Sequence, residues 1–188
     1  MTGVSVAIIV LALLALWLLV AWRGLVAARD GADATWAAID VHLRERQALV
    51  PALAAAVQAE VPGEEPAIGR LLAARDRAAT ATSPWERADA ERSLVAGIAA
   101  VVALAAERHP GLGAEAAFVD LQARLEAIED QIQAARRVYN ADVRLFGRRR
   151  GRLPGLLLRR LGEFAERPYF ELDHTVERGV PALALARA

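Results

Sequence analysis

The first part of the chain is apolar at almost every position. Residues 4–22 are uncharged and interrupted by one serine, and the first charged side chain is Arg23. At about 1.5 Å per residue, a helix of this length reaches roughly 28 Å, close to the hydrocarbon thickness of a bilayer. Trp17 and Trp22 lie toward one end of the run, where indole rings favour the membrane interface. The pattern predicts a transmembrane anchor over residues 1–22.

A cleaved signal peptide is the alternative interpretation of this run. The absence of a basic segment before the run, its length, and the lack of a small-x-small site before Arg23 all favour an uncleaved anchor. Arg23 and Arg29 follow the run, partly offset by Asp30 and Asp33, whereas no basic residue precedes it. The positive-inside rule therefore predicts a single-pass cell-membrane protein with its N-terminus outside and residues 23–188 in the cytoplasm.

Beyond the anchor, apolar residues recur every three or four positions, which is the period of an α-helix that packs on one face. The first helix is predicted to continue from the anchor to about Glu60, and a shorter one covers residues 67–79. Ser83, with Pro84 and Glu86 after it, is a helix start signal, and the helix it opens should end at Arg108. Its uncharged centre is shorter than the roughly 20 residues of a second membrane span, which favours a buried core helix.

The fourth predicted helix, residues 114–146, has the most regular apolar stripe. The stripe suits the seam of a helical bundle, and Gly147 and Gly151 are expected to end the helix. Residues 23–170 are then one helical domain, followed by a loose tail over 171–188. The stripe consists of Phe118, Leu121, Leu125, Ile128, Ile132, Ala135, Tyr139, Val143 and Phe146.

A polar border runs along one edge of this stripe. At 100° per residue, Arg136 and Asn140 fall together on that edge and share it with Glu129, while Tyr139 lies within the stripe. One interpretation is internal packing, in which a buried tyrosine hydroxyl finds a partner and the border selects the neighbouring helix. The other is an interaction edge for a ligand or a protein. Both remain open from the sequence.

Arg46 interrupts the apolar stripe of the first helix. A buried arginine needs a carboxylate or carbonyl partner, and Glu129 is the candidate because it borders the seam of the fourth helix. Alternatively, Pro51 shifts the phase of the helix and leaves Arg46 exposed.

Six arginines lie between residues 148 and 160. If the fourth helix returns toward the membrane, they face an anionic lipid surface; otherwise they form an ordinary solvated surface. Nucleic acid is not expected, because no aromatic interleaving accompanies the cluster. The candidate lipid-facing residues are Arg148, Arg149, Arg150 and Arg152.

Composition excludes several classes of chemistry. Acidic and basic residues balance at 23 each, and the chain contains no cysteine, so disulfides, zinc–thiolate sites and thiol nucleophiles are excluded. His42, His109 and His174 share no metal-ligand spacing. No nucleophile–base pair or paired acid and base is visible. We therefore expect neither an enzyme nor a metal or cofactor site.

Three blocks of the sequence together resemble the LemA family: "TWAAIDVHLRERQALVPALAAAV" (residues 35–57), "HPGLGAEAAFVDLQARLEAIEDQIQAARRVYNADV" (109–143) and "RLPGLLLRRLGEFAERPYF" (152–170). The family usually repeats its Tyr-Asn pair seven residues later, where this chain has Phe146 and Gly147. The resemblance implies a membrane-anchored, antiparallel four-helix bundle with its helical part in the cytoplasm. It brings no enzymatic activity with it.

Two hypotheses for function follow. The first is a non-enzymatic, membrane-tethered scaffold that binds an unknown protein partner, or another copy of itself, along the bundle surface. The second is a sensor that binds a small ligand or lipid between the bundle helices, where such proteins often hold their sites.

Overall fold

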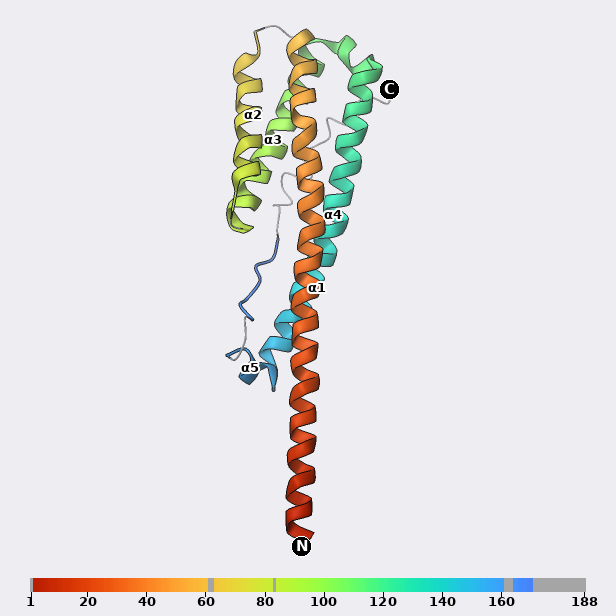
Figure 1. The fold of residues 1–188 in the computed structure, drawn as a ribbon. Helices are drawn as coiled ribbons and strands as arrows, with labels where there is room; N and C mark the ends of the chain where they lie inside the picture. Colours follow the sequence, from red (N-terminus) through yellow and green to blue (C-terminus); the bar gives the residue numbers. More distant parts are fainter. Residues whose placement is uncertain (1, 61–62, 83, 161–163, 171–188) are drawn as a thin grey trace. The chain divides into compact units, whose positions relative to one another are not determined.

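The structure is a computed structural model that describes residues 2–60, 63–82, 84–160 and 164–170 (Figure 1). The described residues form helices and connections, with no strand among them, so the predicted all-α class is confirmed. The Ser83 cap and the tail over 171–188 lie outside the described residues. The elements are α1 (Thr2–Glu60), α2 (Glu65–Thr80), α3 (Pro84–Arg108), η1 (Pro110–Ala114), α4 (Ala116–Gly151) and α5 (Gly155–Leu158).

The single helical domain predicted over residues 23–170 consists of parts of two compact units. We call Met1–Ala37 together with Arg137–Tyr169 the anchor unit. We call Ala38–Arg136 together with Phe170–Ala188 the bundle unit. Helices α1 and α4 contribute residues to both units, and each unit has its own hydrophobic core.

The bundle unit is an antiparallel four-helix bundle, as predicted. Within it, α2 and α4 run opposite to α1 and α3 (Figure 1). Pro51 lies inside α1, where proline costs about 3 kcal/mol relative to alanine. The helix nevertheless continues, because its neighbours Val50, Leu53 and Val57 are fully buried in the shared core. That core also includes Leu71 of α2, Leu94, Val101 and Val102 of α3, Leu112 of η1, and Phe118, Leu121 and Leu125 of α4.

Helix α3 is a core helix of the bundle unit, as its uncharged centre predicted. Gly97 lies close to α2, since a Cβ added there would be 3.3 Å from Cδ1 of Leu71. At the start of the helix, the Glu86 carboxylate accepts hydrogen bonds from the backbone nitrogen and hydroxyl of Thr82, at 3.4 and 3.2 Å. Glu86 therefore reaches back to the residues before the helix, in the manner of a capping box.

The anchor unit contains a small aromatic core. Phe164 packs edge-on against Trp22 with ring centroids 5.1 Å apart, and lies 6.5 Å from the ring of Phe146. Leu25 and Leu158 complete the buried cluster with Ala28. Three separate segments, from α1, α4 and the end of the chain's described part, thus meet at Phe164.

The prediction that Gly147 ends the fourth helix was wrong, because α4 continues to Gly151. A glycine in a helix interior costs only about 1 kcal/mol relative to alanine. Burial of the adjacent Phe146 in the anchor-unit core is worth more than that. Packing thus carries the helix past Gly147.

Gly155 starts α5 at a point where the turn touches the end of α4. A Cβ on Gly155 would lie 2.0 Å from the backbone oxygen of Arg149, far inside van der Waals contact. We expect Gly155→Ala to destabilise the anchor unit by about 1–3 kcal/mol, the usual cost of overpacking. Hydrogen exchange at the end of α4 should accelerate. Gly69→Ala is the matched control, because a Cβ there meets nothing within 4 Å.

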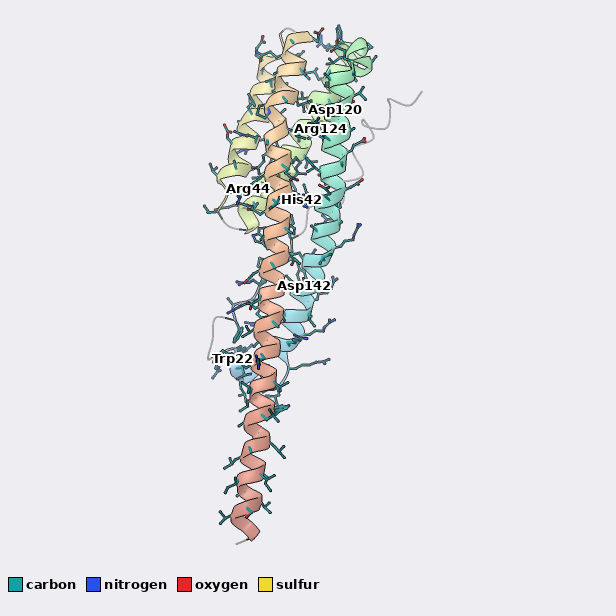
Figure 2. All side chains as sticks on the ribbon, turned by 45° about the vertical axis from the view of Figure 1, so that its right-hand side comes forward. Trp22, His42, Arg44, Asp120, Arg124 and Asp142 are labelled. Carbon is teal, nitrogen blue, oxygen red and sulfur yellow. The ribbon has the colours of Figure 1, made fainter. Side chains whose placement is uncertain are left out.

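The side chains of the apolar run are exposed on helix α1. Its large side chains are exposed, from 38% for Leu18 to 68% for Val4. In Figure 2 they radiate from α1 on the N-terminal side of Trp22, the labelled tryptophan where anchor-unit packing begins. Among the described residues, this helix is the one that is long and apolar enough to cross a membrane.

Candidate functional site

A network of charged and polar side chains is buried inside the bundle unit. We call Arg46, Gln47, Glu91 and Glu129 the charge network. Nη2 of Arg46 lies 2.6 Å from Oε2 of Glu91, and its Nη1 lies 2.5 Å from Oε2 of Glu129. Nε2 of Gln47 donates to Oε1 of Glu91 at 2.6 Å. The Arg46 side chain is 2% exposed and that of Glu91 is 0% exposed.

The charge network joins three helices, because Arg46 is on α1, Glu91 on α3 and Glu129 on α4. Sequence analysis paired Arg46 with Glu129, and the structure brings these two together. The pairing predicted from the sequence did not include Glu91. A signal was present, since Glu91 falls three residues from both Ala88 and Leu94, which are buried on the same face of α3.

The network's two carboxylates are in different surroundings. Glu91 is shielded from solvent, so both of its oxygens depend on Arg46 and Gln47. The Glu129 side chain is 33% exposed and also accepts a hydrogen bond from Nε2 of Gln133 at 3.0 Å. Only Glu129 can therefore replace its contact with Arg46 by water, which makes Glu91 the member most dependent on the network.

A second ion pair links α1 to α3 nearer the bundle surface. The guanidinium of Arg87 contacts the Asp40 carboxylate and also donates to the backbone oxygen of Ala81 at 3.1 Å. Arg44 reaches the same aspartate from one turn along α1. Arg44, labelled in Figure 2, is 74% exposed. The side chains of Arg87 and Asp40 are 21% and 16% exposed, so this pair is only partly accessible to solvent.

Of the three border residues and Tyr139 beside them, two are buried. Arg136 in the bundle unit and Tyr139 in the anchor unit are 7% and 4% exposed. Asn140 and Glu129 are half-buried. A protein docking on the surface would not reach the two buried side chains without rearrangement of the helix packing. These positions therefore fit the internal-packing interpretation better than an open groove.

Tyr139 ties the end of the described chain to the anchor unit. Its hydroxyl donates to the backbone oxygen of Pro168 at 2.8 Å, and its ring packs 5.4 Å from that of Trp36. Burial raises the pKa of the Tyr139 hydroxyl above 10.0, because the phenolate would lose solvent. The nearby Arg167 opposes this pKa shift, and Asp33 adds to it.

Removing the hydroxyl in Tyr139→Phe should lower the free energy of unfolding by about 0.5–1.5 kcal/mol near neutral pH, the usual net worth of a hydrogen bond. Because the folded-state pKa is raised, the folded protein keeps this proton longer than the unfolded chain. Stability of the native protein should therefore fall as pH rises past about 10, where the unfolded tyrosine ionises. Urea unfolding at several alkaline pH values should show the unfolding free energies of the native protein and of Tyr139→Phe converging as pH rises. A constant difference between the two free energies would contradict this.

The arginine cluster divides into two groups. Arg149 donates to the backbone oxygen of Gly24 at 2.6 Å, and Nε of Arg150 donates to that of Phe164 at 2.9 Å. These two arginines therefore hydrogen-bond within the anchor unit, Arg149 while exposed and Arg150 while half-buried. Arg148 and Arg152 are exposed, as are Arg159 and Arg160, which lie further along.

The comparison with known families supports the resemblance of the three blocks. The model of the LemA family matches residues 35–184, which is most of the chain. The chain belongs to the LemA family. The match contains Arg46 and Glu129 of the charge network as well as Tyr139, whereas the apolar run of residues 4–22 lies before it. No curated protein matches the chain.

In this LemA family member, the described residues include no group of three or more histidine, aspartate or glutamate side chains that could hold a metal ion. The charge network has the features of a structural element. It links helices through paired opposite charges. Nε of Arg46 is buried and has no hydrogen-bond acceptor among the described residues.

Proposed function

We propose that this LemA family protein is a membrane-anchored, non-enzymatic interaction protein whose bundle lies in the cytoplasm. The observation that carries the proposal is the exposed apolar run, which opens a helix that continues without interruption to Glu60. Soluble monomers rarely expose an apolar patch larger than a few hundred Å². A bilayer is an environment in which such a helix can bury its apolar side chains on all sides.

The packing of Trp22 favours an uncleaved anchor over a signal peptide. Trp22 lies at the end of the apolar run and packs on Phe164, while Leu25 immediately after it is 1% exposed. Cleavage before Arg23 would remove this tryptophan from the anchor-unit core. We therefore expect the mature protein in the membrane to retain residues 1–22. The mass of the purified protein, measured by mass spectrometry, tests this directly.

Orientation can be tested because the chain has no cysteine. A single cysteine at the exposed Val119 on α4 reports the side of the membrane on which the bundle lies. We expect a membrane-impermeant maleimide to label Val119→Cys only after the cells are permeabilised. Labelling of intact cells would place the bundle outside and contradict the proposed orientation.

The interaction role rests on Val119, an apolar residue that is 43% exposed on α4 of the bundle unit. A photo-crosslinking probe at this position should capture a defined partner, or a second copy of the chain, in intact cells. A probe at the exposed Arg70 on α2 is the control. Equal background adducts from both positions would contradict a partner-binding surface at Val119.

The charge network makes the interaction protein a better proposal than the ligand sensor. A ligand between the helices would need unpaired polar groups to fix its orientation. Here Glu91 and Gln47 are paired with each other, and both terminal nitrogens of Arg46 contact carboxylates, although its buried Nε has no acceptor among the described residues. Binding at this place would require the exchange of existing hydrogen bonds, with little net gain.

A further inference from the structure

We propose that the segment from the last turn of α4 to the two residues after α5 is a second membrane contact, which docks on anionic phospholipid headgroups. We call residues 148–160 the basic turn. The inference rests on the proposed anchor, and it adds a surface that lies flat on the bilayer beside the span. The contacting residues are Arg148, Arg152, Leu153, Leu156, Leu157, Arg159 and Arg160.

The basic turn has one packed face and one unpartnered apolar face. Leu158 is buried in the anchor-unit core, and Pro154 and Gly155 are buried beside it. In contrast, Leu153 is 65% exposed and Leu157 is 60% exposed, and Leu156 between them is also exposed. Leu158 is the leucine of this segment that packs in the core, so the packing of the anchor unit does not explain the three exposed leucines.

Contacts within the anchor unit place this turn at the end of the apolar run. Arg149, at the start of the turn, donates to the backbone oxygen of Gly24 at 2.6 Å. Gly24 lies two residues after Trp22, the last residue of the run. Arg150 is held at the backbone oxygen of Phe164, whose ring packs on Trp22. A bilayer that covers the run up to Trp22 therefore has its headgroup region at the level of the basic turn.

The charge of the turn suits an anionic lipid surface. Arg148 and Arg152 are exposed, and neither has an acidic partner among the described residues; the same holds for Arg159 and Arg160. Exposed leucines with arginines on both sides suit an interfacial segment, in which the apolar side chains enter the acyl boundary and the guanidinium groups bind phosphates. Two members of the predicted lipid-facing set, Arg149 and Arg150, also hydrogen-bond within the anchor unit, to the backbone oxygens of Gly24 and Phe164.

The full chain in nanodiscs provides the test, and the absence of native cysteine allows single spin labels. Labels at Leu157, at Val138 on α4 of the same unit, and at Leu14 in the run are compared by their accessibility to oxygen and to a water-soluble nickel complex. In discs of equal phosphatidylcholine and phosphatidylserine, we expect the Leu157 label to be severalfold more accessible to oxygen than to nickel. We expect Val138 to be water-exposed and Leu14 to be within the bilayer.

The outcomes separate the basic turn from the anchor. A Leu157 label as water-exposed as the Val138 label, with Leu14 in the bilayer, would overturn the second contact and leave the anchor in place. A water-exposed Leu14 label would overturn the anchor itself.

The role of the outward arginines is tested by replacing all four with glutamine: Arg148→Gln, Arg152→Gln, Arg159→Gln and Arg160→Gln. We expect the Leu157 label to rise out of discs that contain phosphatidylserine, to the depth it has in phosphatidylcholine alone. The matched control is Arg137→Gln with Arg144→Gln, two exposed arginines on α4. An unchanged depth in the fourfold variant would overturn recognition of anionic lipid.

Discussion

Replacement of Glu91 by alanine is expected to lower the free energy of unfolding of the bundle unit by about 3–5 kcal/mol, the cost of leaving a buried charge without its partner. Glu91 is fully buried and accepts hydrogen bonds from both Arg46 and Gln47. Its removal takes one of two carboxylates from the buried Arg46 guanidinium and the hydrogen-bond acceptor from Gln47, which leaves Arg46 with the partly exposed Glu129 alone. A loss of this size is a large share of the 5–15 kcal/mol that typically stabilises a folded domain.

Urea unfolding of the protein in a mild detergent, followed by circular dichroism, measures this loss. Glu129→Ala is the matched control, because the Glu129 side chain is partly exposed and water can take its place; we expect a smaller loss there. The double variant Arg46→Met with Glu91→Leu should recover much of the stability, since buried ion pairs replaced by apolar residues are often tolerated. An unchanged urea midpoint in Glu91→Ala would contradict the network as the structure has it.

The second large effect is expected for Phe164→Ala. Phe164 is 3% exposed, and its ring contacts Trp22 and Phe146 while the Arg29 guanidinium lies 5.8 Å from its centroid. Truncation of a buried phenylalanine to alanine costs about 3–5 kcal/mol through lost burial and the cavity that remains. We therefore expect the segment around residue 164 to separate from the anchor unit in a large part of the molecules.

Hydrogen exchange followed by mass spectrometry measures this separation segment by segment. Exchange should accelerate at residues 143–151 of α4 and at the end of the described chain, with α2 and α3 unchanged. Tyr169→Ala is the control, since Tyr169 is an exposed aromatic residue near the same segment. If Phe164→Ala behaves like this control, the aromatic core is not what holds the anchor unit together.

The elements of this protein were largely predictable from its sequence. Periodicity is a local property, so the spacing of apolar residues alone indicated α1 as far as Glu60 and α3 as far as Arg108. The apolar run was equally predictable, because its length and composition can be compared with the thickness of a bilayer without knowledge of any tertiary contact. Even the pairing of Arg46 with Glu129 was accessible, since a charge within an apolar stripe requires a partner.

The tertiary structure alone decided which side chains meet. Glu91 joins the charge network because α3 presents that face to α1, and the rotation of a helix about its axis depends on packing between segments far apart in sequence. The same reason explains why α4 continues through Gly147 and why Arg149 and Arg150 reach the backbone oxygens of Gly24 and Phe164. A sequence pattern indicates that a residue lies at a helix edge. Only the neighbouring helices determine whether that edge is covered.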